Sequence, residues 1–283
     1  MATLATEVVV TGLRFGEGPR WHEGRLWFSD MHDQRVLAMS PDGALEEICR
    51  VPAEPSGLGW LPDGRLLVVS MQDRCLLRQE PDGTLDLHAD LSGLASFHCN
   101  DMVVDQQGRA WVGNFGFDLH ARADFRPAEL IRVDPDGQAA VVARELDFPN
   151  GTVVTPDGRQ LIVAESFAGC LTAFDIGADG SLSGRRRWAQ LPEGEVPDGI
   201  CLDADGAIWV ASPTGNACLR VQEGGVVTDR VELDRGAFAC MLGDADRRTL
   251  YVCSAQDSDP AASHARSGRI ERVRVTVPGA GLP

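Results

Sequence analysis

A short turn followed by an apolar segment recurs along this chain at a spacing of roughly 40 to 50 residues. Each copy has a glycine two or three residues before a run such as Leu66-Leu67-Val68-Val69 or Leu161-Ile162-Val163. Apolar runs bounded by turn residues are typical of short β-strands, so the repeated unit is built from strands. The turn glycines are Gly24, Gly64, Gly108, Gly158 and Gly206, and a degenerate copy without glycine spans residues 246–252.

Each unit contains a second turn, as in Pro41-Asp42-Gly43, Pro81-Asp82-Gly83 and Pro135-Asp136-Gly137. Asp-Gly between two strand-like runs indicates a hairpin, because glycine accepts the positive φ of a tight turn. Two hairpins give four strands per unit. Six such units predict an all-β fold, a six-bladed β-propeller with four-stranded blades, as one domain over residues 1–283. We expect residues 7–10 to pair with residues 270–277 and complete the last blade.

Composition narrows the classes of partner. The formal net charge is −16 without an opposing basic cluster, which argues against nucleic acid and anionic membranes. The first residues lack the basic and apolar regions of a signal peptide, and no apolar run is long enough to span a membrane. The eight cysteines form no Cys-x-x-Cys pair, which predicts buried free thiols in a reducing compartment. We therefore expect a cytoplasmic protein.

Four oxygen-bearing side chains occupy one repeat position. In a propeller the first strand of each blade lines the central channel, and Glu17, Asn100, Asn150 and Asp198 each open such a strand. Two carboxylates with amide oxygens suit Ca²⁺, Mg²⁺ or Mn²⁺ better than a soft metal. Asn and Asp before glycine also favour ordinary turns, which is the alternative at any single position. The remaining two openings are Ser56 and Phe238, the latter with an uncertainty of about one residue in register.

A cation in this channel could be a structural plug or a catalytic ion. A catalytic ion would acidify a bound water, and Asp198 or Asp101 could accept the proton. His98 lies two residues before Asn100 and is expected near the same mouth, where it could bind substrate. Glu165 is expected to be a solvated or turn carboxylate. The sequence has no Gly-x-Ser-x-Gly, His-Glu-x-x-His or phosphate-binding loop.

Two long connections interrupt the repeat, at residues 114–129 in blade 3 and 254–268 in blade 6. Long loops in a compact fold often close over a site, so both are candidate lids. The first contains Phe115, Phe117 and Phe125, which predicts a less polar pocket.

The segments around the four channel residues resemble the senescence marker protein/gluconolactonase family, which includes regucalcin. The matching segments are Glu17-Gly18-Pro19-Arg20-Trp21, Asn100-Asp101, Pro149-Asn150-Gly151 and Pro197-Asp198-Gly199-Ile200. The resemblance implies metal ligation by Glu17, Asn150 and Asp198, with Asp198 also the general base. It implies substrate or outer metal contact by Asn100. Sugar-lactone hydrolases of this family often carry Arg where this chain has His98.

The resemblance implies an enzyme that opens a lactone ring with metal-activated water, acting on a sugar lactone or a more apolar one. We expect catalysis by Asp198, metal binding by Glu17, Asn150 and Asp198, and substrate binding by Asn100, His98 and Asp101. The expected cofactor is one divalent cation, Ca²⁺ first, with Mg²⁺, Mn²⁺ or Zn²⁺ as alternatives. A phosphoester or organophosphate hydrolase and a non-catalytic binding propeller stay open. The expected partner is a small-molecule lactone or ester, and the chain a monomer or small homo-oligomer.

Overall fold

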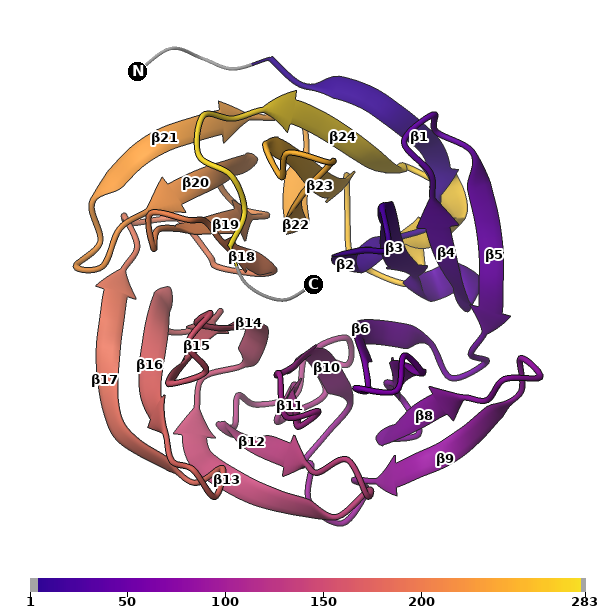
Figure 1. Cartoon of the computed structure of the whole chain (residues 1–283). Helices are drawn as coiled ribbons and strands as arrows, with labels where there is room; N and C mark the ends of the chain where they lie inside the picture. Colours follow the sequence, from indigo (N-terminus) through magenta and orange to yellow (C-terminus); the bar gives the residue numbers. More distant parts are fainter. Residues whose placement is uncertain (1–4, 281–283) are drawn as a thin grey trace.

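The computed structural model describes residues 5–280 and consists of six antiparallel four-stranded sheets arranged around one centre (Figure 1). The predicted six-bladed propeller is confirmed, and the first five blades run from the channel outward in chain order. The turns between first and second strands are the predicted glycine turns, which adopt positive φ at Gly24, Gly64 and Gly108. The first three blades comprise β2 (Gly16–His22), β3 (Arg25–Asp30), β4 (Arg35–Met39) and β5 (Leu45–Arg50); β6 (Pro55–Trp60), β7 (Leu66–Ser70), β8 (Cys75–Gln79) and β9 (Leu85–Asp90); and β10 (Cys99–Val104), β11 (Ala110–Asn114), β12 (Ala128–Val133) and β13 (Ala139–Leu146).

The fourth and fifth blades repeat this order, and the sixth joins the two ends of the chain. β1 (Glu7–Leu13) pairs antiparallel with β24 (Gly268–Arg274), so that Glu7 lies opposite Arg272. The predicted closure is confirmed, although β24 begins and ends earlier than residues 270–277. The other strands are β14 (Pro149–Val154), β15 (Gln160–Glu165), β16 (Cys170–Ile176) and β17 (Leu182–Gln190); β18 (Ile200–Leu202), β19 (Ile208–Ser212), β20 (Ala217–Val221) and β21 (Val227–Glu232); and β22 (Gly236–Gly243) and β23 (Thr249–Ala255).

Helical structure in residues 5–280 is limited to two short 3-10 turns, η1 (Met31–Asp33) and η2 (Ala262–Ala265). Neither is long or apolar enough to cross a membrane. Apolar side chains fill the spaces between neighbouring blades, including the fully buried Trp111 and Trp209 of β11 and β19. Burial of these sheet faces is the main stabilising term of such a fold. That residues 1–283 form one domain stays a prediction.

The eight cysteines all lie in the described part of the chain and are free thiols. Seven are buried and Cys49 is half-buried. The expectation of free thiols is therefore confirmed, and Cys49 is the least buried of them.

Candidate metal centre and active site

The six inner strands place the four predicted oxygen-bearing residues around one cavity. Glu17, Asn100 and Asn150 are each the second residue of β2, β10 and β14, and Asp198 lies two residues before β18. All four line a cavity of about 250 Å³ at the end of the channel where these inner strands begin. Phe238 of β22 also lines it, at the position expected for blade 6.

The inner strands lose regular pairing where these residues sit. Pairing of β2 with β3 shifts between Glu17 and Arg20, and that of β14 with β15 between Pro149 and Thr152. β6, β10 and β22 show the same irregularity near their starts. A β-bulge bends its strand and re-aims a side chain, and here the bulges accompany the side chains at the axis.

Glycines after the axial residues let neighbouring blades approach closely. A Cβ on Gly151 would lie 2.5 Å from the backbone nitrogen of Ile200 and 2.6 Å from the backbone carbonyl oxygen of Asp198. The Gly151 N–H donates to that same oxygen at 3.1 Å. The Asn150-Gly151 pair, which alone would favour a turn, therefore serves packing between β14 and blade 5.

Glu17 is buried, Asp198 is half-buried, and their carboxylates repel each other. Burial, followed by the Asp198 charge, raises the pKa of Glu17 well above its usual range. Burial and the Asp101 charge do the same for the pKa of Asp198, opposed by a hydrogen bond from Asn150. The Gly18 N–H donates to Glu17 Oε2 at 3.0 Å but adds no counter-charge. A cation between the two carboxylates would remove this repulsion.

Asn150 is oriented by a neighbour in the same blade. Its Nδ2 donates to Ser166 Oγ at 3.2 Å, and Ser166 Oγ donates to the Pro197 carbonyl at 2.7 Å. This contact uses the amide nitrogen and leaves the oxygen for a ligand. Ser166 lines the cavity and had not been expected at the site, because nothing in Ala164-Glu165-Ser166 distinguishes it locally.

Asp101 lies apart from the residues that line the cavity. Its Oδ1 accepts from Arg20 Nη2 at 2.7 Å and from the Met102 N–H at 2.9 Å. Arg20 Nη2 also donates to the Met102 carbonyl, and both side chains are almost fully buried. Substrate contact by Asp101, expected from the sequence, has no support in this geometry. The pair instead forms the floor beneath Glu17.

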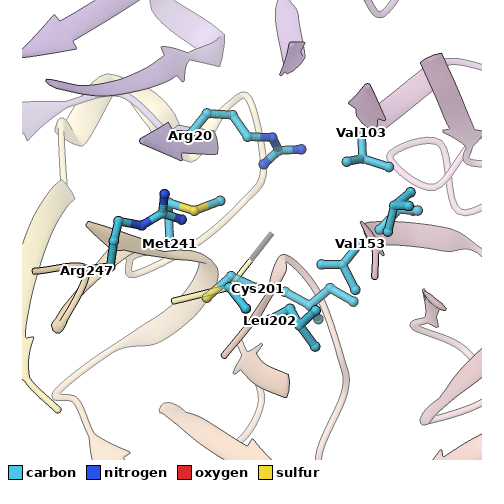
Figure 2. A pocket seen from close by; sticks show the side chains of 11 residues that line it. Arg20, Val103, Val153, Cys201, Leu202, Met241 and Arg247 are labelled. Carbon is cyan, nitrogen blue, oxygen red and sulfur yellow. The ribbon is translucent and has the colours of Figure 1, made fainter. Parts of the chain in front are cut away.

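Beyond this pair the channel is nearly filled. Figure 2 shows Arg20, Met241 and Arg247 on one side, with Val103 and Val153 opposite. The free space there is about 20 Å³, roughly the room of one water molecule. A substrate must therefore reach the four axial residues from the opposite mouth.

His98 lines the cavity together with Asn100, as expected. Its ring stacks on Phe97 with centroids 4.1 Å apart. Burial lowers the pKa of His98, against smaller opposing effects of Asp118 and Glu54. A neutral imidazole offers one N–H donor and one acceptor, far fewer donors than a guanidinium.

Both long loops border the cavity. Residues 114–129 contribute Phe115, Leu119 and His120, and residues 254–268 contribute Ser258 and Pro260. His32 Nε2 lies 3.2 Å from the Ser258 carbonyl and ties the second loop to blade 1. Their closing as a lid stays a prediction.

Glu165 differs from its expectation as a solvated or turn carboxylate. It is only 3% exposed and accepts hydrogen bonds from Thr172 Oγ1 and from the Asp147 N–H. Arg185 approaches it at 3.4 Å. Glu165 is thus a buried, partnered group outside the cavity, because β16 and β17 cover the end of β15.

The donor set fits a hard divalent cation. Residues 5–280 bring no three His, Cys, Asp or Glu side chains together as a metal site. The axial set has only two carboxylates and completes itself with amide oxygens, which is ordinary for Ca²⁺ and Mg²⁺. The repelling carboxylates of Glu17 and Asp198 beside Asn150 are the observation that favours an ion here.

Comparison with known proteins shows the family of this chain. The family model described as SMP-30/gluconolactonase/LRE-like region matches residues 15–256. The chain belongs to this family. Among family relatives, it is 28% identical over 277 residues to a 6-deoxy-6-sulfogluconolactonase of Pseudomonas putida, covering 95% of this chain and 94% of the relative. A pentonolactonase of Haloferax volcanii is 28% identical over 263 residues, covering 91% and 87%.

The fold of a solved family structure is also shared. Regucalcin from Agrobacterium tumefaciens, described as a calcium-binding protein, superposes with a TM-score of 0.83 at 23% identity. The match covers 100% of this chain and 99% of that one. At this identity the likeness concerns the fold.

Proposed function

We propose that this chain is a divalent-metal-dependent lactonase. The observation that carries the proposal is the pair Glu17 and Asp198 with Asn100 and Asn150 at the base of a cavity open at one end. Two relatives named as lactonases, each similar over most of its length, support lactone hydrolysis as the reaction class.

Glu17, Asn150 and Asp198 would hold the cation, for which Ca²⁺ is the first choice because all donors are oxygens. When bound, the ion supplies polarisation of the lactone carbonyl and a more acidic water. Asn100 and the neutral His98 orient the ester group by hydrogen bonds. Asp198 accepts the proton of the attacking water. One water is consumed, the acyl C–O bond breaks, the ring oxygen takes a proton, and a hydroxy acid is released.

Replacing Asp198 tests this function. Asp198→Ala should lower metal-dependent lactone hydrolysis by about a hundredfold to ten-thousandfold, the range for loss of an acid–base group. The matched control is Asp205→Ala in the same blade, whose carboxylate is 64% exposed and outside the cavity. Activity is measured on a panel of lactones and phosphotriesters after chelation and with Ca²⁺, Mg²⁺, Mn²⁺ or Zn²⁺ added.

Unchanged turnover in Asp198→Ala would contradict the assignment of this residue. A wild-type protein that binds a cation but turns over nothing would identify a binding propeller instead. Preference for phosphotriesters over all lactones would favour the organophosphate alternative.

A further inference from the structure

Two aromatic groups border the cavity from opposite sides of the ring. On the side of blades 3 and 4, Phe148 packs against Phe115 at 4.6 Å and against Phe167 at 5.3 Å between ring centroids. On the side of blades 6 and 1, Phe15 and Phe238 pack edge to face at 4.8 Å. All five rings line the cavity, and Figure 1 shows these blades across the channel from each other.

Polar side chains on the cavity wall are largely bonded to protein groups. Glu54 pairs with His32 Nδ1 at 3.0 Å and accepts from Gln72 Nε2 at 2.9 Å. Thr214 Oγ1 donates to the Gly194 carbonyl at 2.7 Å. Ser166 is committed to Asn150 and Pro197. These bonds hold the groups in place and use part of their hydrogen-bonding capacity.

Other polar groups of the lining are the axial oxygens at the base of the cavity, the imidazole of His98, and His120, which is exposed. This set can hold one ester group. A ligand with hydroxyls around its ring would bury several of them against phenylalanine, where each would lack a hydrogen-bond partner.

Resting on the proposed lactonase function, we infer that the substrate is a lactone with an apolar alkyl or aryl substituent. The ester group lies at the base near Asp198, and the substituent lies between the two aromatic groups. Each added methylene leaves water and packs against phenylalanine, which strengthens binding by about threefold to fourfold. The chemical step is the same hydrolysis, with water as the only co-reactant.

A homologous substrate series tests this inference. The wild-type protein is assayed on δ-valerolactone, δ-hexalactone, δ-octalactone, δ-decalactone and glucono-δ-lactone at one saturating cation. We expect kcat/KM to rise about a hundredfold from the methyl-substituted to the pentyl-substituted ring. Glucono-δ-lactone should be at least about tenfold poorer than δ-octalactone.

A variant at the cavity wall tests where the substituent binds. Phe167 is 53% exposed, so Phe167→Ala should fold normally, and its ring borders the cavity. It should reduce the gain in kcat/KM from the methyl-substituted to the pentyl-substituted ring at least about fivefold. The matched control is Phe125→Ala, a ring 45% exposed that stacks on Phe167 from outside the cavity.

The outcomes separate the two proposals. Flat or falling kcat/KM along the series, with glucono-δ-lactone best, overturns the apolar substrate and leaves the lactonase standing. Equal loss in Phe167→Ala and Phe125→Ala overturns the placement of the substituent against the cavity wall. Hydrolysis of no lactone with any of the four cations overturns the proposed function itself.

Discussion

At the scale of single residues, Arg20 places one positive charge beside the two buried carboxylates of Asp101 and Glu17. It pairs directly with Asp101 and lowers the pKa of Glu17, although burial and Asp198 outweigh it there. The pair bridges β2 and β10, 81 residues apart in the chain. Because this ion pair is buried, removal of either partner would leave an unpaired charge in the channel.

Substitution of Arg20 tests how much its pairing with Asp101 contributes to stability. We expect Arg20→Met to lower the free energy of unfolding by about 3 to 5 kcal/mol, because Asp101 would stay buried without a counter-charge. Ca²⁺ should restore more stability in this variant than in the wild-type protein. Urea unfolding with chelator and with Ca²⁺ measures both effects.

The control for this prediction is Arg20→Met combined with Asp101→Leu, which removes both charges. It should recover most of the lost stability, since apolar replacements of buried pairs are often neutral or better. If Arg20→Met alone lowers the free energy of unfolding by less than about 1 kcal/mol, Asp101 is not an uncompensated buried charge in that variant.

Repetition in the sequence is what made the axial residues predictable. Asn150 before Gly151 reads as a turn, and only the matching positions of Glu17 and Asp198 distinguish it. Arg20 lies in a segment that resembles the family, but the sequence assigned it no role. Its partner Asp101 belongs to another blade, and such a distant pair has no local sequence pattern. The same reason explains why Asp101 was expected in the cavity.

At the scale of strands, five of the six inner strands show a pairing irregularity near their starts, and β14 also approaches the next blade closely at Gly151. Turn chemistry is local and periodic, so the number of strands and blades followed from the sequence. Strand ends and bulges depend on contacts between blades, which is why β24 ends earlier than expected. Bulges at the axis likewise had no sequence signal.

Gly151→Ala tests whether Gly151 is needed for the close packing of β14 against blade 5 rather than for a turn. Its Cβ would press on Asp198 and Ile200, costing about 1 to 3 kcal/mol of stability as an overpacked contact. Because Asn150 and Asp198 both shift, cation affinity should fall as well. Thermal unfolding and calorimetric Ca²⁺ titration check the two effects.

The matched control is Gly93→Ala, where an added Cβ meets nothing within 4 Å and φ is not in the left-handed range. It should be neutral or slightly stabilising. If Gly151→Ala behaves like this control, the close approach of β14 to blade 5 is not required for the site.

At the scale of the whole molecule, buried thiols couple stability to alkaline pH. Burial raises the pKa of Cys99 to about 12, and it raises the pKa of Cys201, Cys240 and Cys253 well above the usual range. In the unfolded chain a thiol ionises near pH 8.5. Above that pH the folded state therefore binds more protons than the unfolded state, and stability falls as pH rises.

We expect the free energy of unfolding to fall by about 1.4 kcal/mol per pH unit above about pH 9 for each of these four thiols. Urea unfolding at pH 8, 9 and 10 under a reducing agent measures this slope. Cys201→Ala should reduce the slope by about 1.4 kcal/mol per pH unit, the share of one thiol. A stability that does not change between pH 8 and pH 10 would contradict the prediction.

Closure of the ring by β1 and β24 has a consequence for biosynthesis. The strand that emerges first from the ribosome pairs with one made some 265 residues later, as the Arg272 and Glu7 contact shows. At the usual rate of translation this interval is on the order of tens of seconds. During that time the edge that β1 will cover does not yet exist, and Val10 and Leu13 lack their core partners. The last blade therefore cannot be completed until β24 has been synthesised.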